Sequence, residues 1–183
     1  MRPDTGEERA PLVAELYEWL GTVVFAVTAV VLAFTFLLRT VGVDGSSMEP
    51  TLHHGDRVVI THLMYRPEPG DIVVITQPNS ADVPIVKRII ADEGQSVMID
   101  FSAGTVEVDG VVLSEPYIKE PTHLKRDVEF PVTVPPGCVF VMGDNRNRSL
   151  DSRDSGVGMI DKRYILGKAV FRFFPFDQIG GLG

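Results

Sequence analysis

The chain has 183 residues, 44% of them apolar, which suffices for one sizeable core or for one domain plus an anchor. Its formal net charge of −8 gives no footprint for a nucleic-acid partner, which would require clustered Lys and Arg. The lone cysteine, Cys138, excludes an intramolecular disulfide, and the four histidines lack zinc spacing, so we expect no metal site. The apolar setting of Cys138 favours a buried packing thiol over a nucleophile.

The first predicted element is a membrane span. Residues 19–38 are 20 residues without a charge, and a helix of that length crosses about 30 Å, the thickness of a bilayer's hydrocarbon core. Trp19 and Arg39 flank the run as interface anchors do, and the run is too long for a removable signal peptide. We therefore predict a tail over residues 1–18 and a transmembrane helix over 19–38. The flanking arginines are nearly balanced, so charge alone leaves the orientation open.

Short runs of β-branched residues follow, separated by Gly, Pro and Asp turn signals. A two-residue turn, Asp109–Gly110, divides the run 106–113 into a hairpin. The Phe-rich stretch 171–176 is interpreted as core packing rather than as a surface resting on lipid. The fold class is therefore mainly β, a predominantly antiparallel domain over residues 39–183. The other predicted strands are 57–61, 71–76, 84–90, 139–142 and 167–174.

Three polar features stand out from this β pattern. Ser47 lies in a turn, Gly-Ser-Ser-Met-Glu-Pro-Thr-Leu over residues 45–52, although turn serines usually only make local hydrogen bonds. Lys87 interrupts an apolar strand. If it is buried, desolvation lowers its pKa, and a shift from ~10.4 to about 8 costs roughly 3 kcal/mol. Residues 143–156 form a dense polar loop in which Asp and Arg can pair.

Each feature also has a simpler interpretation. Lys87 could be an edge-strand lysine in water, and the loop could be merely solvated. Arg88 has the opposite parity to Lys87, so it must point to the other face of the strand.

Together these stretches resemble the ordered motifs of the type I signal peptidases, membrane-bound serine proteases with a Ser-Lys dyad. The resemblance extends from Arg39 onward and depends on four stretches that occur in the family's order. The four together identify the family far more specifically than any one of them would. Residues 45–52 resemble the nucleophile motif, 68–75 a structural strand, 86–90 the base motif, and 143–153 the last motif.

The resemblance implies a role for five residues. Ser47 would be the nucleophile and Lys87 the general base. Ser149 would hydrogen-bond the lysine amine, while Asp151 and Arg153 would hold the site by ion pairing. No metal or cofactor is then needed. The substrate-binding residues implied are Val41, Val43, Gly45, Leu52, Ile85 and Val86.

The same resemblance implies the substrate and the location. The expected partners are the small-x-small ends of signal peptides on exported preproteins, bound as an extended strand, and membrane lipid. The expected location is the plasma membrane, with a single span, the tail in the cytoplasm and the catalytic domain outside.

Some positions depart from the usual pattern. Gly45 stands two residues before Ser47, where some members carry a serine whose hydroxyl joins the oxyanion hole, so only backbone N–H groups are assured here. Asn147 and Arg148 stand where aspartate and asparagine are common. Two alternatives remain open: another kind of Ser-Lys peptidase, and an inactive membrane-tethered homologue acting in surface protein assembly.

Overall fold

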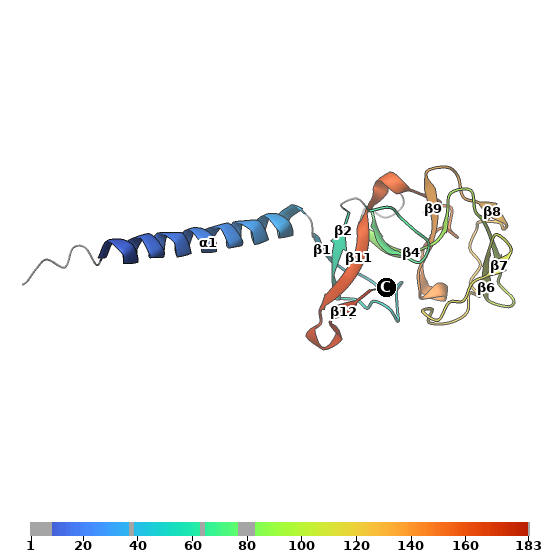
Figure 1. Ribbon diagram of the computed structural model, residues 1–183. Coiled ribbons are helices and arrows are strands. Elements are labelled where there is room, and N and C mark those ends of the chain that lie inside the picture. The colour runs from blue at the N-terminus through green and yellow to red at the C-terminus, as the bar shows by residue number, and fades with distance from the viewer. Residues whose placement is uncertain (1–8, 37–38, 63–64, 77–82, 183) are drawn as a thin grey trace, which may run out of the picture. The chain divides into compact units, whose positions relative to one another are not determined.

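The computed structural model describes residues 9–36, 39–62, 65–76 and 83–182 (Figure 1). The chain divides into two compact units that meet between Arg39 and Thr40. Each unit is described by itself.

The N-terminal unit is one long helix, α1 (Arg9–Phe36). Its stretch Val13–Leu32 is long and apolar enough to cross a membrane, and none of it is buried within the protein. The helix begins before the predicted span, because nothing between Arg9 and Trp19 stops it: Pro11 lies in the first turn, where proline is tolerated. Residues 9–18, assigned to the tail, are therefore helical. Residues 37–38 of the predicted span lie outside the described residues.

The second unit is built from two sheets, so the mainly β fold class is confirmed. The larger sheet has the order β1-β2-β11-β3-β4-β9-β10, with β12 on β11, and the strand pairs from β2 to β10 are antiparallel. The smaller sheet has the order β7-β6-β5-β8 and is also antiparallel. The bounds of the larger sheet are β1 Arg39–Gly42, β2 Arg57–Thr61, β3 Ile72–Ile75, β4 Ile85–Asp92, β9 Cys138–Met142, β10 Ile160–Asp161, β11 Ile165–Phe174 and β12 Gly180–Gly181. Those of the smaller sheet are β5 Ser96–Asp100, β6 Thr105–Val108, β7 Val111–Val112 and β8 Val132–Thr133.

All the predicted strands are present, and β2 has the predicted bounds. In the hairpin of β6 and β7, Asp109 and Gly110 have φ of 52° and 81°, the two positive values that a two-residue turn of this kind requires. The sequence did not predict β5, because Met98 is apolar yet faces solvent between the buried Val97 and Ile99 and so obscures the alternation. It also missed β1 and the two-residue strands β8, β10 and β12.

The core positions the turn that carries Ser47. Met48 and Leu52 of that turn are buried in one apolar cluster with residues of β2, β3 and β4. A second cluster fills the space between the two sheets. Cys138 packs against this cluster, but it is half-buried rather than buried as expected. The turn is therefore fixed to the sheet by its own apolar residues.

The interpretation of the Phe-rich stretch as core packing is wrong. Phe171, Phe174 and Phe176 are 39%, 41% and 77% exposed. Register shifts in β11 after Ala169 break the strand's parity. Of its two partners there, β2 and β12, the two-glycine strand β12 has no side chains that could cover the rings. The Phe174 and Phe176 rings pack edge to face, and Ile179 is also exposed. We call these four exposed apolar residues the phenylalanine ribbon.

Candidate active site

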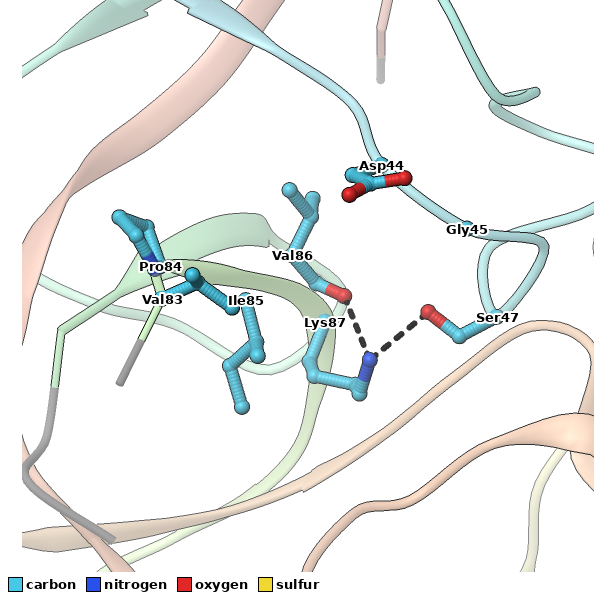
Figure 2. Close-up of a pocket in the computed structure, with 8 residues that line it drawn as sticks. All are labelled: Asp44, Gly45, Ser47, Val83, Pro84, Ile85, Val86 and Lys87. Carbon is cyan, nitrogen blue, oxygen red and sulfur yellow. Dashed lines mark hydrogen bonds between the residues drawn. The ribbon is translucent and has the colours of Figure 1, made fainter. Parts of the chain in front are cut away.

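Ser47 and Lys87 meet although they lie 40 residues apart. The Lys87 Nζ is 2.8 Å from the Ser47 Oγ and 3.0 Å from the Val86 carbonyl oxygen. Figure 2 shows the lysine side chain reaching from β4 toward the turn that carries the serine. A hydroxyl at hydrogen-bond distance from an amine is the geometry that proton transfer between them requires.

Lys87 is withdrawn from water. Its strand, β4, lies between β3 and β9, and Lys87 is only 3% exposed, so it is not an edge-strand lysine in water. Burial is the main reason that its pKa falls from 10.5 to about 8. The carboxylates of Asp151 and Asp144 favour the ammonium and so oppose this shift, whereas the positive charge of Arg153 lowers the pKa further. An amine with this pKa is partly neutral near neutral pH and can act as a base.

Arg88 lies on the opposite face of β4, as its parity predicts, and is buried as well. Its guanidinium forms a two-pronged ion pair with Asp144, at 2.9 and 2.7 Å, and donates to the Gly70 carbonyl oxygen at 2.7 Å. It also lies 4.0 Å from the centre of the Tyr117 ring. These two adjacent residues thus differ in charge balance: within the part of the chain that the structure describes, Arg88 forms an ion pair with a carboxylate and Lys87 forms none.

The polar loop after β9 is buried rather than solvated. Asp151 and Arg153 are fully buried, and their expected ion pair is present, with Nε and Oδ1 2.8 Å apart. Asp151 also accepts the Gly143 N–H at 3.0 Å. Burial would raise the pKa of Asp151, but Arg153 and these hydrogen bonds outweigh it and keep the pKa below its ordinary value. The ionised pair holds the loop in place.

Ser149 differs from its expected role. Its Oγ is fully buried and lies near the Asp151 carboxylate, yet among the described residues it completes no hydrogen bond, and the bond expected to the Lys87 amine is not formed. The amine is directed instead at Ser47 and at the Val86 carbonyl. Ser149 packs against Gly143, where a β-carbon would collide with both its Oγ and the Ser47 carbonyl oxygen, so only glycine fits.

The turn that carries Ser47 is also tied to the polar loop. Asn145 donates twice to it: its backbone N–H to the Ser47 carbonyl oxygen and its side-chain Nδ2 to the Ser46 carbonyl oxygen, both at 3.0 Å. Thr51 donates to Asp144 at 2.5 Å. Sequence reasoning assigned no role to Asn145, because its partners lie 99 and 98 residues earlier and no local signal links them.

A pocket adjoins the Ser-Lys pair. Its volume is about 250 Å³, and Figure 2 shows Ser47 and Lys87 at one side of it. Asp44, which was not predicted, also lines it and pairs with His54 at 3.0 Å. The residues that line it are Asp44, Gly45, Ser47, Val83, Pro84, Ile85, Val86 and Lys87.

Only half of the predicted substrate-binding residues lie at this pocket. Gly45, Ile85 and Val86 do. The assignment of Val43 and Leu52 is corrected, since both are buried in the core, and Val41 packs against the same cluster. The apolar side chains of β1 and of the turn that follows it point into the core of the sheet. The residues of this segment that line the pocket beside Ser47 are therefore Asp44 and Gly45.

The lowered pKa of Lys87 predicts how stability depends on pH. Between about pH 8 and 10.5 the unfolded chain binds more protons than the folded chain, so the free energy of unfolding rises with pH in that window. Below pH 8 Lys87 is protonated in the folded state, and the cost of burying its charge lowers the free energy of unfolding by about 3 kcal/mol. Lys87→Met should therefore raise the free energy of unfolding at pH 7 by up to about 3 kcal/mol, and the gain should shrink toward pH 10.5.

Urea unfolding of the full chain in detergent at pH 7, 9 and 10.5 measures this effect. Lys125→Met, which replaces a half-exposed lysine, is the matched control and should show no such pH dependence. A Lys87→Met gain that is constant from pH 7 to 10.5 would contradict a buried amine of low pKa.

Comparisons with known proteins identify the family of the chain. Residues 16–174 match the family described as signal peptidase, peptidase S26. The chain is 41% identical to signal peptidase I of Bacillus licheniformis over 174 residues, covering 90% of this chain and 91% of that protein. It is 38% identical to signal peptidase I T of Bacillus subtilis, covering 88% and 87%.

A solved structure is also similar. The crystal structure of a signal peptidase I from Enterococcus faecalis is 29% identical and matches with a TM-score of 0.47, covering 57% of this chain and 97% of that one. The family match spans most of the chain, from within α1 to the end of β11, and the Bacillus relatives are matched over nearly their whole lengths. The chain therefore belongs to the signal peptidase family, peptidase S26.

Proposed function

We propose that the chain removes signal peptides from preproteins by acyl transfer through Ser47 and Lys87. The observation that carries the proposal is the 2.8 Å separation between the Ser47 Oγ and a buried Nζ whose pKa is about 8. The relatives are named signal peptidases, and their family is one of serine endopeptidases. The alternative of an inactive homologue has no such support, since the chain keeps both members of the dyad in contact.

In the acylation step, neutral Lys87 takes the proton of the Ser47 hydroxyl. The Oγ forms a bond to the scissile carbonyl carbon, and the oxyanion that results accepts a hydrogen bond from the Ser47 backbone N–H. The Lys87 ammonium then gives its proton to the departing amide nitrogen, the C–N bond breaks, and the mature protein leaves with a free amino terminus.

Deacylation reverses the roles. Neutral Lys87 takes a proton from a water molecule, whose oxygen attacks the ester carbon. The bond from the ester carbon to the Ser47 Oγ breaks, the Oγ recovers a proton from the ammonium, and the signal peptide leaves with a new carboxylate. With a pKa of about 8, roughly one lysine in ten is neutral at pH 7, which is enough for a base that acts in each turnover.

The pocket favours an extended substrate with small side chains. Strand β4 pairs with β3 from Ile85 onward, but its pairing with β9 starts only at Arg88, so among the described residues one edge of 85–87 is unpaired. A signal peptide that pairs with this edge would place alternate side chains over Ile85, Val86 and Gly45. A pocket of about 250 Å³ suits small-x-small sequences such as Ala-x-Ala.

Processing of a precursor with an Ala-x-Ala site tests the dyad directly. Ser47→Ala and Lys87→Ala should each lower kcat/KM on the order of 10³-fold or more, because one removes the nucleophile and the other its base. The controls are Ser102→Ala and Lys125→Ala, which remove an exposed hydroxyl and a half-exposed amine far along the chain. They should process the precursor like the wild type.

The same assay across pH identifies the base. Below about pH 8 the rate should fall tenfold per pH unit as Lys87 gains its proton, and it should level off above. An acid limb near 6.5 would point to a histidine instead. Equal processing by the wild type and both dyad variants would eliminate the mechanism.

We also propose that residues 19–38 anchor the chain in the plasma membrane as a single span, with residues 39–183 as the catalytic domain on the extracytoplasmic face. A signal peptide presents its cleavage site where it leaves the bilayer on that face. Protease added to intact protoplasts should remove a C-terminal epitope and spare an N-terminal one. The opposite pattern would place the domain in the cytoplasm.

The phenylalanine ribbon is proposed to contact lipid. A domain joined at Arg39 to a membrane span stays within reach of the bilayer surface, and exposed aromatic rings partition into that interface. In a Trp19→Phe background, which removes the chain's one tryptophan, Phe176→Trp should be quenched by brominated lipid in reconstituted vesicles. Tyr164→Trp, beside the other end of β11, is the control. Equal quenching of both would contradict the contact.

A further inference from the structure

One buried residue, Asn145, holds the backbone on both sides of the nucleophile, with its side chain on one side and its backbone N–H on the other. The Asn145 Nδ2 donates to the Ser46 carbonyl oxygen, and the Asn145 N–H donates to the Ser47 carbonyl oxygen, each at 3.0 Å. Asn145 is fully buried and touches the turn from a loop that follows β9. These two carbonyls belong to the peptide units before and after the Ser47 Cα.

The first of these bonds determines where the Ser47 N–H points. The Ser46 carbonyl and the Ser47 N–H belong to one planar trans peptide unit and point in opposite directions. A donor that fixes the carbonyl oxygen therefore fixes the N–H. The second bond fixes the next peptide unit, so the backbone torsions on both sides of the Ser47 Cα are held from one residue.

The N–H that is aimed in this way is free for a substrate. Among the described residues it donates to no acceptor, while Ser47 itself lines the pocket. Gly45 has no side chain that could add a second donor from two residues earlier. The oxyanion therefore depends strongly on this one backbone N–H, and losing a donor of this kind costs about 10²- to 10³-fold in kcat.

We propose that Asn145 is a positioning residue that aims the Ser47 N–H at the oxyanion. This inference rests on the proposed function and adds a residue to it. The turn's own hydrogen bond, from the Glu49 N–H to the Ser46 carbonyl oxygen, is longer at 3.2 Å and moves with the turn. Asn145 supplies the anchor from outside the turn. Its neighbours Asp144 and Arg146 are themselves fixed by buried ion pairs with Arg88 and Glu115.

The oxygen of the same side-chain amide allows the effect on activity to be distinguished from an effect on stability. The Asn145 Oδ1 is buried and has no hydrogen-bond partner among the described residues, which destabilises the folded state. Leucine has the same number of side-chain heavy atoms, branched at the same carbon, and would remove that unpaired acceptor along with the donor. Asn145→Leu should therefore lower activity without lowering stability.

The experiment compares Asn145→Leu with the wild type as full chains in detergent. We expect kcat to fall on the order of 10- to 100-fold, because the N–H is misdirected rather than removed. KM should stay within about threefold, the acid limb should stay near pH 8 because Lys87 is untouched, and the thermal midpoint should be unchanged or higher. Asn145→Ala serves as a second variant.

The matched control is Asn147→Leu, two residues further along. The Asn147 amide accepts from the His123 and Leu124 N–H groups and donates to the Pro121 carbonyl oxygen, so its bonds hold another loop and none reaches the turn of Ser47. This variant should lose stability and keep its kcat, the reverse of Asn145→Leu.

A tetrahedral probe gives a second readout. A peptide aldehyde adds the Ser47 Oγ to its carbonyl, and the resulting oxygen occupies the position of the oxyanion, whereas the matching peptide alcohol forms no such adduct. Asn145→Leu and Asn145→Ala should weaken aldehyde binding by about the factor lost in kcat and leave the alcohol unchanged.

An unchanged kcat, or equal loss of aldehyde and alcohol binding, would overturn the inference. So would a fall in kcat accompanied by a shifted acid limb or a lowered thermal midpoint, since Asn145 would then support the dyad or the fold. Lys87→Ala, run in parallel, separates the two proposals. Full activity without Lys87 contradicts the proposed function, whereas a normal dyad with an unaffected Asn145→Leu contradicts only this inference.

Discussion

The site depends on keeping one amine away from water without giving it a counter-ion. Lys87 and Arg88 are neighbours on β4, and both are buried. Arg88 is balanced by Asp144, and Asp151 is occupied by Arg153, so the two carboxylates that would hold Lys87 as an ammonium are already paired. By pairing with these carboxylates, the two arginines weaken their effect on Lys87, so burial becomes the main influence on the pKa of the lysine.

The second requirement is that the hydroxyl stay where the amine can reach it. The turn of Ser47 is fixed to the larger sheet by Met48 and Leu52, whose side chains lie in the core of that sheet. It is also fixed to the loop after β9 by hydrogen bonds, which include the one from Thr51 to Asp144 and both bonds donated by Asn145. Because both sets of contacts exist in the free protein, little ordering is left for substrate binding to accomplish.

The sequence predicted what local patterns control. Strand parity placed Lys87 and Arg88 on opposite faces, and turn chemistry placed the Asp109–Gly110 hairpin. The Ser47–Lys87 contact came from family resemblance, since periodicity does not specify a pairing across 40 residues. Other features depend on packing: Asn145 was missed because its partners are distant, and the Phe-rich stretch was misread because register shifts in β11 are invisible in the sequence. Local patterns likewise did not indicate that the Ser149 hydroxyl has no hydrogen-bond partner among the described residues.

In the proposed mechanism, the open edge of β4 would link substrate binding to the chemistry. Among the described residues, 85–87 lack a strand neighbour on one side, and this stretch carries the proposed base, Lys87, and lines the pocket. A substrate strand that pairs there would displace water from the pocket and bring the scissile carbonyl toward Ser47 in the same movement. Because desolvation is the largest cause of the lowered pKa, covering this edge would favour the neutral amine further. The base would then be most active when a peptide is in place to react, and the free enzyme would hold most of its lysine protonated at neutral pH.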